Sequence, residues 1–510
     1  MELQEIQQSL AQKGNAAEAL NSLGSLLREE SWRNNDEVKP LITEALGLLG
    51  TDEIIDLEVL RVLVNFTADN DENRRILAGE EGFWDWVAGA LEKPGSVSER
   101  TLILMTQFIH NVNEADAPAF TALLGDFRES LVELVGQEVS EQAVEILSEL
   151  SEKVLWETSQ EEATQLVNQM KDEFEEFDEE LQLYFSLLFF KLTKSDTLQF
   201  DPHATLGLFD KVAQGDDTSR IKRYLFAGHG NIFSQPSYDN WANVEKSIDF
   251  SVGEADPYAA SAVAIDIGNC VKSENDQNRL IALIDEKVGL QTFITALLGR
   301  PFSDVVQYQC IHCFTNILQP HTAALILQNW HHLGRMVKAV LDNAQFYPEI
   351  AALMSKFSKK LAKSVETGPE HKELWRLFAE GAAEEVLLSL LQNEKALSLV
   401  DDEILQPAFL KALFRVPQQV DVMVLLDQLR AQAVFLHGTA PEQFSSALTE
   451  SYTEFFTSLS AASSDHKDGP GWNVVANNAK FVAASGAKYF ESSQEAVAIS
   501  QDFVRTINSA

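Results

Sequence analysis

The sequence predicts an all-α protein built as a helical-repeat solenoid, and three observations support this class. Leu, Val and Ile recur at three- and four-residue spacings with acids and Gln between them, as in "EVLRVLVNF" and "AVEILSELSEKVL". Alternating, strand-like segments bounded by Asn-Gly turns are absent. The chain has 510 residues, more than one compact core usually serves, so an extended repeat structure or several domains are expected.

A repeated corner indicates the type of repeat. An Asn follows an apolar stretch and precedes a polar link in "VNFTADND", "IHNVNEAD", "IGNCVKSEND" and "FTNILQPH", which hold Asn65, Asn111, Asn269 and Asn316. The first two Asn residues are 46 apart and the last two 47 apart, which fits the period of armadillo and HEAT repeats, about 40–47 residues. We therefore predict an armadillo/HEAT-like right-handed superhelix in which the last helix of each repeat lines the concave face.

Each Asn in such a corner has two possible roles. Its amide can hydrogen-bond the backbone while the following Asp, Glu and Asn residues form the turn and the N-cap of the next helix. It can also offer the amide to a partner in the concave face. The sequence leaves both roles open.

Domain limits follow from breaks in the helical pattern. We expect the solenoid to occupy residues 1–460, with possible subdivision near 212–240 and 366–373. A loop is expected at 461–472, in "AASSDHKDGPGWN", and helices that cap the solenoid at 473–510. The "GHGN" at 228–231 does not open a βαβ unit, and we interpret it as a flexible loop in a polar insertion.

The charge restricts the partners. With 78 acidic and 39 basic residues the formal net charge is −39, which disfavours nucleic acid and anionic lipid and favours a basic partner protein. The acidity could equally serve solubility alone. Three cysteines, no basic-then-apolar leader and no apolar run long enough to span a bilayer lead us to expect a cytoplasmic protein without direct membrane insertion.

No pattern for catalysis is found in the sequence. A phosphate-binding Gly-rich loop, a nucleophile elbow and a kinase signature are all missing. Cys310 and Cys313 have a metal-like spacing, but they lie in an amphipathic helical segment without a second Cys pair, which favours core thiols. We therefore expect a non-catalytic binding protein with no cofactor and no metal.

An acidic segment is the strongest charge feature. If "QEEATQLVNQMKDEFEEFDEELQLYF", residues 160–185, were one helix, five acids would share a broad face opposite Phe174, Phe177 and Leu181. The five acids are Asp172, Glu175, Glu176, Glu179 and Glu180. Neighbouring like charges repel by a few tenths of a kcal/mol per pair, so a cationic partner would be favoured there. A solvated outer face would show the same pattern.

The order of these segments resembles the SmgGDS family, armadillo-repeat guanine-nucleotide dissociation stimulators of small GTPases, including their fungal bud-emergence relatives. The resemblance rests on "EVLRVLVNFTADNDENRRILAGEEG", "TLILMTQFIHNVNEADAPAF", "DPYAASAVAIDIGNCVKSENDQN" and "VVQYQCIHCFTNILQP", which occur in the family's order within about residues 50–345. The last third of the chain matches poorly.

This resemblance implies binding of a small GTPase, of Rho type above all, with a polybasic tail that is prenylated in some cases. It implies that Asn269 and Asn316 contact the GTPase, with Asn65 and Asn111 in the same row, and that the five acids meet the polybasic tail. The outcome would be GDP release or chaperoning of the GTPase. The alternative is a generic armadillo adaptor that holds a basic peptide without exchange activity.

Overall fold

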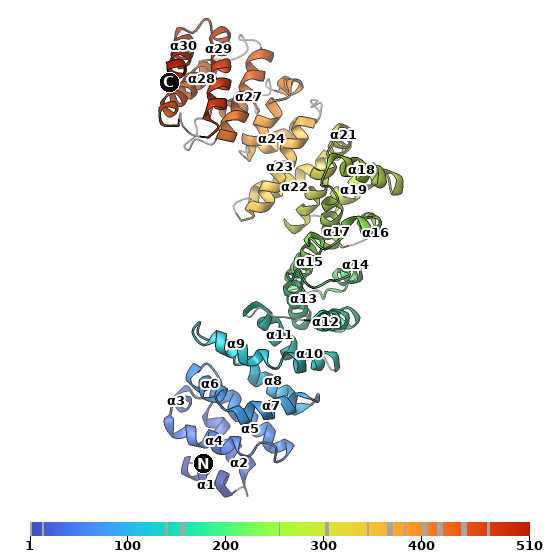
Figure 1. Cartoon of the computed structure of the whole chain (residues 1–510), viewed down its shortest axis with the longest axis vertical. Coiled ribbons are helices and arrows are strands. Elements are labelled where there is room, and N and C mark those ends of the chain that lie inside the picture. The colour runs from blue at the N-terminus through green and yellow to red at the C-terminus, as the bar shows by residue number, and fades with distance from the viewer. Residues whose placement is uncertain are drawn as a thin grey trace. The chain divides into compact units, whose positions relative to one another are not determined.

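The structure is a computed structural model that describes residues 3–12, 15–137, 141–153, 159–253, 256–300, 305–343, 346–364, 371–381, 384–399, 405–415, 422–439, 446–466 and 470–509. Within these ranges every regular element is an α-helix or a 3₁₀-helix, which confirms the all-α class. The chain divides into two compact units, residues 1–238 and 239–510 (Figure 1). This boundary falls inside the interval 212–240.

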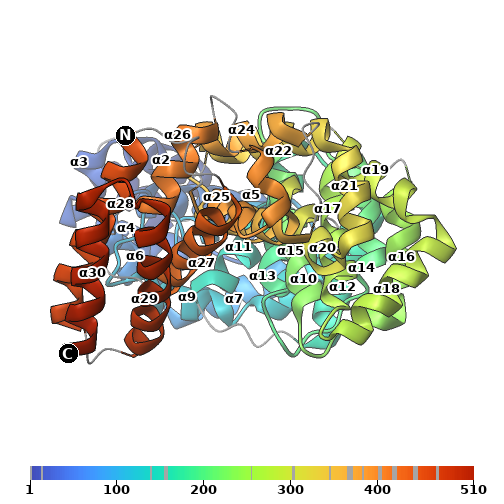
Figure 2. The same cartoon turned by 90° about the horizontal axis from the view of Figure 1, so that it is seen from above.

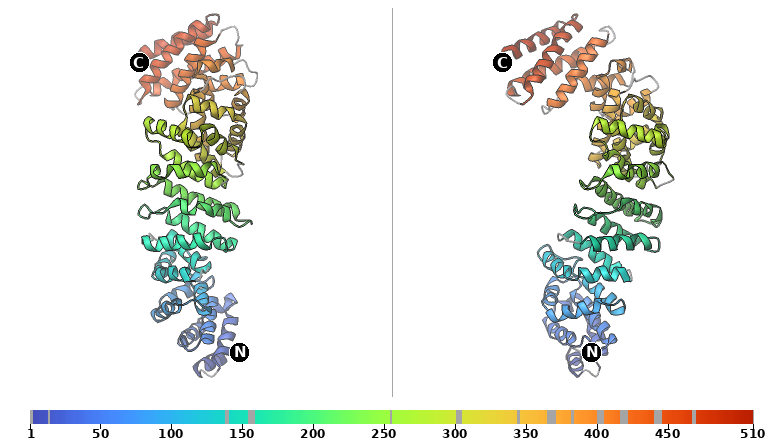
Figure 3. Two further views of the ribbon diagram at one scale, coloured as in Figure 1. Left: turned by 90° about the vertical axis from the view of Figure 1, so that its right-hand side faces the viewer. Right: turned by 45° about the vertical axis from the view of Figure 1, so that its right-hand side comes forward.

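In unit 1 one row of helices runs the length of the unit, each packed against the previous and the next; we call it row A. Its members are α2 (Ala16–Leu26), α5 (Glu53–Thr67), α8 (Ser96–Thr106), α11 (Glu141–Lys153), α13 (Glu179–Leu192) and α15 (Thr218–Ser234). Figure 3 shows successive helices of the unit lying side by side. In a solenoid each repeat packs only against the repeats before and after it, and row A has this pattern.

The other helices of unit 1 cover row A or connect its members. They are α1 (Leu3–Gln12), α3 (Glu30–Arg33), η1 (Asp36–Val38), α4 (Lys39–Leu46), α6 (Asp71–Ala78), α7 (Glu81–Leu91), α9 (Ala117–Gly125), α10 (Arg128–Gln137), α12 (Gln160–Glu173), α14 (Pro202–Thr205) and η2 (Leu206–Lys211). The triplets α3–α5, α6–α8 and α9–α11 each hold a short helix followed by two longer ones, an armadillo-like arrangement.

Unit 2 repeats the plan. Its row A is α17 (Pro257–Asn269), α20 (Cys310–Ile317), α23 (Pro348–Ser364), α25 (Glu384–Leu391), α27 (Val422–Gly438) and α29 (Trp472–Tyr489). The remaining helices are α16 (Asn240–Val252), α18 (Glu274–Lys287), α19 (Leu290–Gly299), η3 (Val305–Gln309), α21 (Pro320–Gln328), α22 (Trp330–Asn343), α24 (Lys372–Glu380), η5 (Glu394–Leu399), α26 (Leu405–Phe414), α28 (Ser446–His466) and α30 (Gln494–Ser509). In Figure 2, α16, α18 and α19 lie to the right of α17 and α20.

Two of the four predicted corners, those after Asn65 and Asn269, are helix-to-helix turns with polar N-caps. After α5, Asn70 accepts a hydrogen bond from the backbone N–H of Asn73 at 3.0 Å and caps α6. After α17, Ser273 accepts one from the N–H of Asp276 at 3.2 Å and caps α18. Each cap satisfies a backbone donor that the first turn of a helix leaves unpaired, and this explains why both corners are rich in short polar residues.

Two loop predictions are wrong. Residues 228–231, expected in a flexible loop, lie inside α15, where the His229 side chain is fully buried and its Nε2 lies 2.9 Å from the Thr205 hydroxyl. The glycine at 228 permits close packing, because a Cβ there would lie 2.6 Å from the ring of Phe189. Residues 461–466 belong to the end of α28, and α29 begins at Trp472. Of the expected break at 366–373, residues 366–370 lie outside the described ranges.

The three cysteines are core thiols, as expected. Cys270, Cys310 and Cys313 are buried in unit 2 and form no disulfide. Burial raises the pKa of Cys270 to about 12 and that of Cys310 to about 11, so both stay protonated and unreactive near neutral pH.

Candidate protein-interaction surface

The corner Asn residues hold neighbouring row A helices together. Asn65 on α5 donates from Nδ2 to the carbonyl oxygen of Gly24 on α2 at 2.8 Å. Asn316 on α20 donates in the same way to the carbonyl of Gly268 on α17 at 2.9 Å. Both amides are half-buried, so each bond satisfies two polar groups in a helix–helix seam. Asn65 and Asn316 therefore both have the structural one of the two roles that the sequence left open.

The glycine in each pair also makes room for a long side chain. One helical turn before Asn65, the Arg61 guanidinium carbon lies 3.2 Å from the place where a Cβ of Gly24 would be. One turn before Asn316, Nδ1 of His312 lies 2.6 Å from the corresponding point on Gly268. In both corners the contact between successive helices therefore has three parts: the Asn, a glycine on the preceding helix, and a long side chain one turn before the Asn.

The other two predicted Asn residues are placed differently. Asn111 lies in the turn after α8 with a left-handed φ of 50°, and its Nδ2 donates to Asp69 Oδ1 at 3.2 Å. Asn269 is the last residue of α17 and directly follows the acceptor Gly268. The spacing of four Asn residues therefore brings Asn65 and Asn316 into equivalent contacts but not Asn111 or Asn269, because helix lengths differ between repeats.

Asn231 makes a related contact that the sequence interpretation missed. On α15 it donates from Nδ2 to the Phe190 carbonyl on α13 at 3.4 Å and to the Thr193 hydroxyl at 3.2 Å. It belongs to the "GHGN" segment. Its partners lie about 40 residues earlier in the sequence, on the preceding row A helix, so the local pattern held no signal for this contact.

The five predicted acids do not share a helix face. α12 ends at Glu173, and α13 begins at Glu179 after a turn in which Asp178 accepts from the Leu181 N–H and caps α13. Glu175 pairs with Lys211 at 3.5 Å, and Glu179 accepts from the Asp217 backbone N–H at 2.6 Å. Asp172 and Glu176 are exposed. The single acidic face is wrong, because the N-cap at Asp178 starts a new helix.

Glu180 instead joins acids from the neighbouring row A helix. We define the acidic cluster as Glu141 and Glu145 on α11 together with Asp178 and Glu180 at the start of α13. Nε2 of His110 lies 2.8 Å from Glu145 Oε1, and the Tyr184 hydroxyl donates a hydrogen bond to the same oxygen at 3.0 Å. Burial and then the charges of Glu180, Asp178 and Glu145 raise the pKa of Glu141. A cation placed beside Glu141 would stabilise its ionised form.

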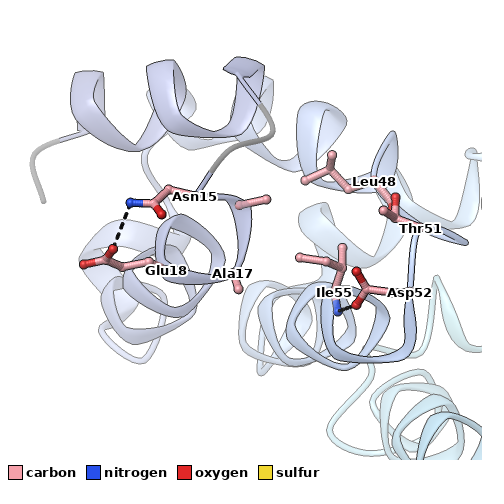
Figure 4. A pocket seen from close by; sticks show the side chains of 8 residues that line it. Asn15, Ala17, Glu18, Leu48, Thr51, Asp52 and Ile55 are labelled. Atoms are coloured by element: carbon pink, nitrogen blue, oxygen red, sulfur yellow. Dashed lines mark hydrogen bonds between the residues drawn. The ribbon is translucent and has the colours of Figure 1, made fainter.

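Two cavities lie near the two ends of the described chain. One of about 360 Å³ lies between the start of α2, the end of α4 and the start of α5 (Figure 4). Its polar groups are already used: Asn15 donates to Glu18 at 3.0 Å, and Asp52 caps α5 through the Ile55 N–H. The other, of about 530 Å³, is an apolar groove between α29 and α30. Neither gathers groups for chemistry.

Neither a metal site nor a membrane-spanning helix is found among the described residues. No group of His, Cys, Asp and Glu in the described ranges could hold a metal ion. Among those same ranges, no helix is both long and apolar enough to cross a membrane.

Family models match both parts of the chain. The BEM4 C-terminal domain matches residues 204–507, and the BEM4 N-terminal domain matches residues 1–184. This chain belongs to the BEM4 family. The bud-emergence part of the sequence resemblance is thereby confirmed, and the family and helical-repeat fold together indicate a protein-interaction scaffold.

Other comparisons are more distant. No curated protein matches this BEM4-family chain. A crystal structure of an engineered protein aligns at a TM-score of 0.38 and 14% identity over 82% of this chain and 94% of its own. A structure from a study of a phosphorylation switch in the cadherin–beta-catenin interaction aligns at a TM-score of 0.47 and 11% identity, over 97% and 96%.

Proposed function

We propose that this chain binds a small GTPase with a polybasic tail, and that binding stimulates GDP release or chaperones the GTPase. The acidic cluster carries this proposal. Four carboxylates from two successive row A helices converge there, and burial, followed by repulsion from the other three, raises the pKa of Glu141. Lys and Arg side chains of a tail would relieve that repulsion, and the attraction would weaken as salt rises.

A second surface, on unit 2, is proposed to contact the GTPase. Asn269 ends α17, and Asn316 follows on the next row A helix, so both lie along the α17–α20 seam. The folded body of the GTPase would contact this seam. Nucleotide release would follow if the complex favours a nucleotide-poor form of the GTPase, which is differential binding rather than bond chemistry.

The double variant Asn269→Ala with Asn316→Ala is expected to weaken binding of a GDP-loaded Rho-type GTPase by more than tenfold. Titration calorimetry at low salt measures this. Asn231→Ala is the matched control, because it removes a related hydrogen bond between successive row A helices of unit 1 at a residue outside the predicted GTPase-binding row. Equal weakening by Asn231→Ala would show that loss of a helix–helix contact, and not of a contact surface, explains the effect.

Glu141→Gln is expected to raise thermal stability at pH 7 and to weaken GTPase binding. The raised pKa means that the ionised Glu141 destabilises the folded protein, so stability falls as pH rises through its folded pKa, and Gln removes that cost. The same change removes a charge that a basic tail would use. Scanning calorimetry and GTPase titration on one sample test both parts, and tighter or unchanged binding would contradict the assignment.

The adaptor alternative uses the same acidic cluster for a basic peptide and involves no nucleotide exchange. A fluorescent-GDP release assay across a panel of polybasic GTPases separates the two. Faster release from at least one GTPase supports exchange. Binding of a free Lys/Arg-rich peptide, with no GTPase bound at low salt, supports the adaptor.

A further inference from the structure

Unit 2 holds a basic surface in an acidic protein. Residues 330–364 contain six Lys and Arg residues and two acids, whereas the whole chain carries a net charge of −39. On α23, Lys356, Lys360 and Lys363 follow at intervals of four and three residues and are all exposed, so they form one stripe along the helix.

The stripe lies against the preceding row A helix. Lys360 Nζ donates to the carbonyl oxygen of Thr315 on α20 at 2.7 Å. Lys356 acts electrostatically on His312, one turn before Asn316. We define the basic seam as His312, Lys356, Lys360 and Lys363. It continues the row of contacts that begins at Gly268 and passes through His312 and Asn316.

The positive charges of the seam are not neutralised within the described part of unit 2. Lys356 and Lys363 take part in none of its ion pairs. Burial, and then repulsion from Lys356, lower the pKa of both His312 and Lys360. The nearby acids of α25 already have cations: Glu385 pairs with Lys359, and Glu384 pairs with Lys411 and Arg415.

We propose that the basic seam on α20 and α23 binds a short acidic segment of a partner protein. Carboxylates would meet Lys356 and Lys363 at the surface and relieve the repulsion that Lys356 exerts on Lys360 and His312. A membrane or a nucleic acid presents negative charge over a wide area and would be repelled by the rest of a chain at −39. A short segment contacts the seam alone, because charges more than about 8 Å away are screened at physiological salt. This proposal goes beyond the GTPase proposal and rests on the lysines of α23, while its His312 adjoins Asn316 of the α17–α20 seam.

The test is fluorescence anisotropy with a labelled peptide of alternating Glu and Asp, using the full chain at about 0.15 M salt, where the distant acids are screened. Lys356→Glu with Lys363→Glu should weaken binding more than tenfold. The matched control is Lys93→Glu with Lys488→Glu, which changes the net charge equally at exposed positions outside residues 330–364. The control should weaken binding less than threefold. Lys356→Gln with Lys363→Gln gives a milder loss and serves if the charge reversal impairs folding.

Four results would overturn the proposal. They are no peptide binding by the unaltered chain at about 0.15 M salt, equal weakening by the control, binding of phosphatidylserine vesicles but not of the peptide, and self-association in sedimentation experiments that the seam variant abolishes. The third would make a lipid surface the ligand, and the fourth a second copy of this chain.

Discussion

Asp266→Asn is expected to stabilise the start of unit 2 at pH 7 by about 2–3 kcal/mol, because burial of an ionised carboxyl costs about 1.4 kcal/mol per unit of pKa shift. Asp266 on α17 is fully buried, and burial raises its pKa from 3.8 to about 6. It accepts hydrogen bonds from Asn240 Nδ2 at 2.7 Å and from the Ser247 hydroxyl at 2.5 Å, both on α16. An Asn can accept from Asn240 and donate to Ser247, so both contacts survive without the charge.

The effect of Asp266 on stability depends on pH, and its sign follows from the raised pKa of this carboxyl. The folded pKa of Asp266 lies above the unfolded value, so its contribution to stability is complete below about pH 4 and is lost as pH rises to about 6. The difference between Asp266→Asn and the unaltered chain should therefore be small at pH 4 and reach its maximum above pH 6. Hydrogen exchange of the amides in α16 and α17 measures it locally, which avoids assuming that the whole chain unfolds in one step.

Ser247→Ala is the opposing control. It removes a donor that stabilises the carboxylate, so faster exchange at pH 7 is expected. If Asp266→Asn exchanged faster than the unaltered chain at pH 7, the account of this buried carboxyl would be wrong.

Gly486→Ala is expected to destabilise unit 2 by about 1–3 kcal/mol, the usual cost of overpacking a core. Gly486 lies inside α29, where Ala would ordinarily gain up to about 1 kcal/mol of helix propensity. Here a Cβ would lie 2.1 Å from the hydroxyl oxygen of Tyr452 and 2.4 Å from its ring. Tyr452 on α28 is fully buried, and its hydroxyl lies 2.8 Å from that of Ser500, so it has no space to yield.

Gly89→Ala is the matched control for that measurement. Gly89 lies inside α7, and a Cβ there would meet nothing within 4 Å. It should stabilise its unit by about 0.5–1 kcal/mol through the helix propensity alone. Thermal melts of the two variants should move in opposite directions. A stabilising Gly486→Ala would contradict the packing of α28 against α29.

The helical class and the repeat plan could be predicted from local patterns. Apolar residues at helical spacing mark the buried side of each helix, and Asn70 and Ser273 occur where the backbone needs an N-cap. These signals lie within a few neighbouring residues, so no tertiary information is needed to interpret them.

The candidate surfaces depended on contacts between repeats, about 40 residues apart in the chain. The prediction of one acidic helix was wrong because Asp178 caps a new helix within that segment. Glu180 then meets Glu141 on the neighbouring row A helix. The "GHGN" loop was wrong because its glycine fits against the Phe189 ring, a contact that composition does not reveal.

The sequence by itself determined that this chain is an acidic, all-helical repeat protein with recurring Asn corners. Only the tertiary structure decided that Asn65 and Asn316 bond to glycine carbonyls, that the four carboxylates converge in one acidic cluster, and that Lys356 lies beside His312. The physical reason is that helix formation depends on residues within one or two turns, whereas each surface is assembled from side chains on successive helices, whose register is set by packing.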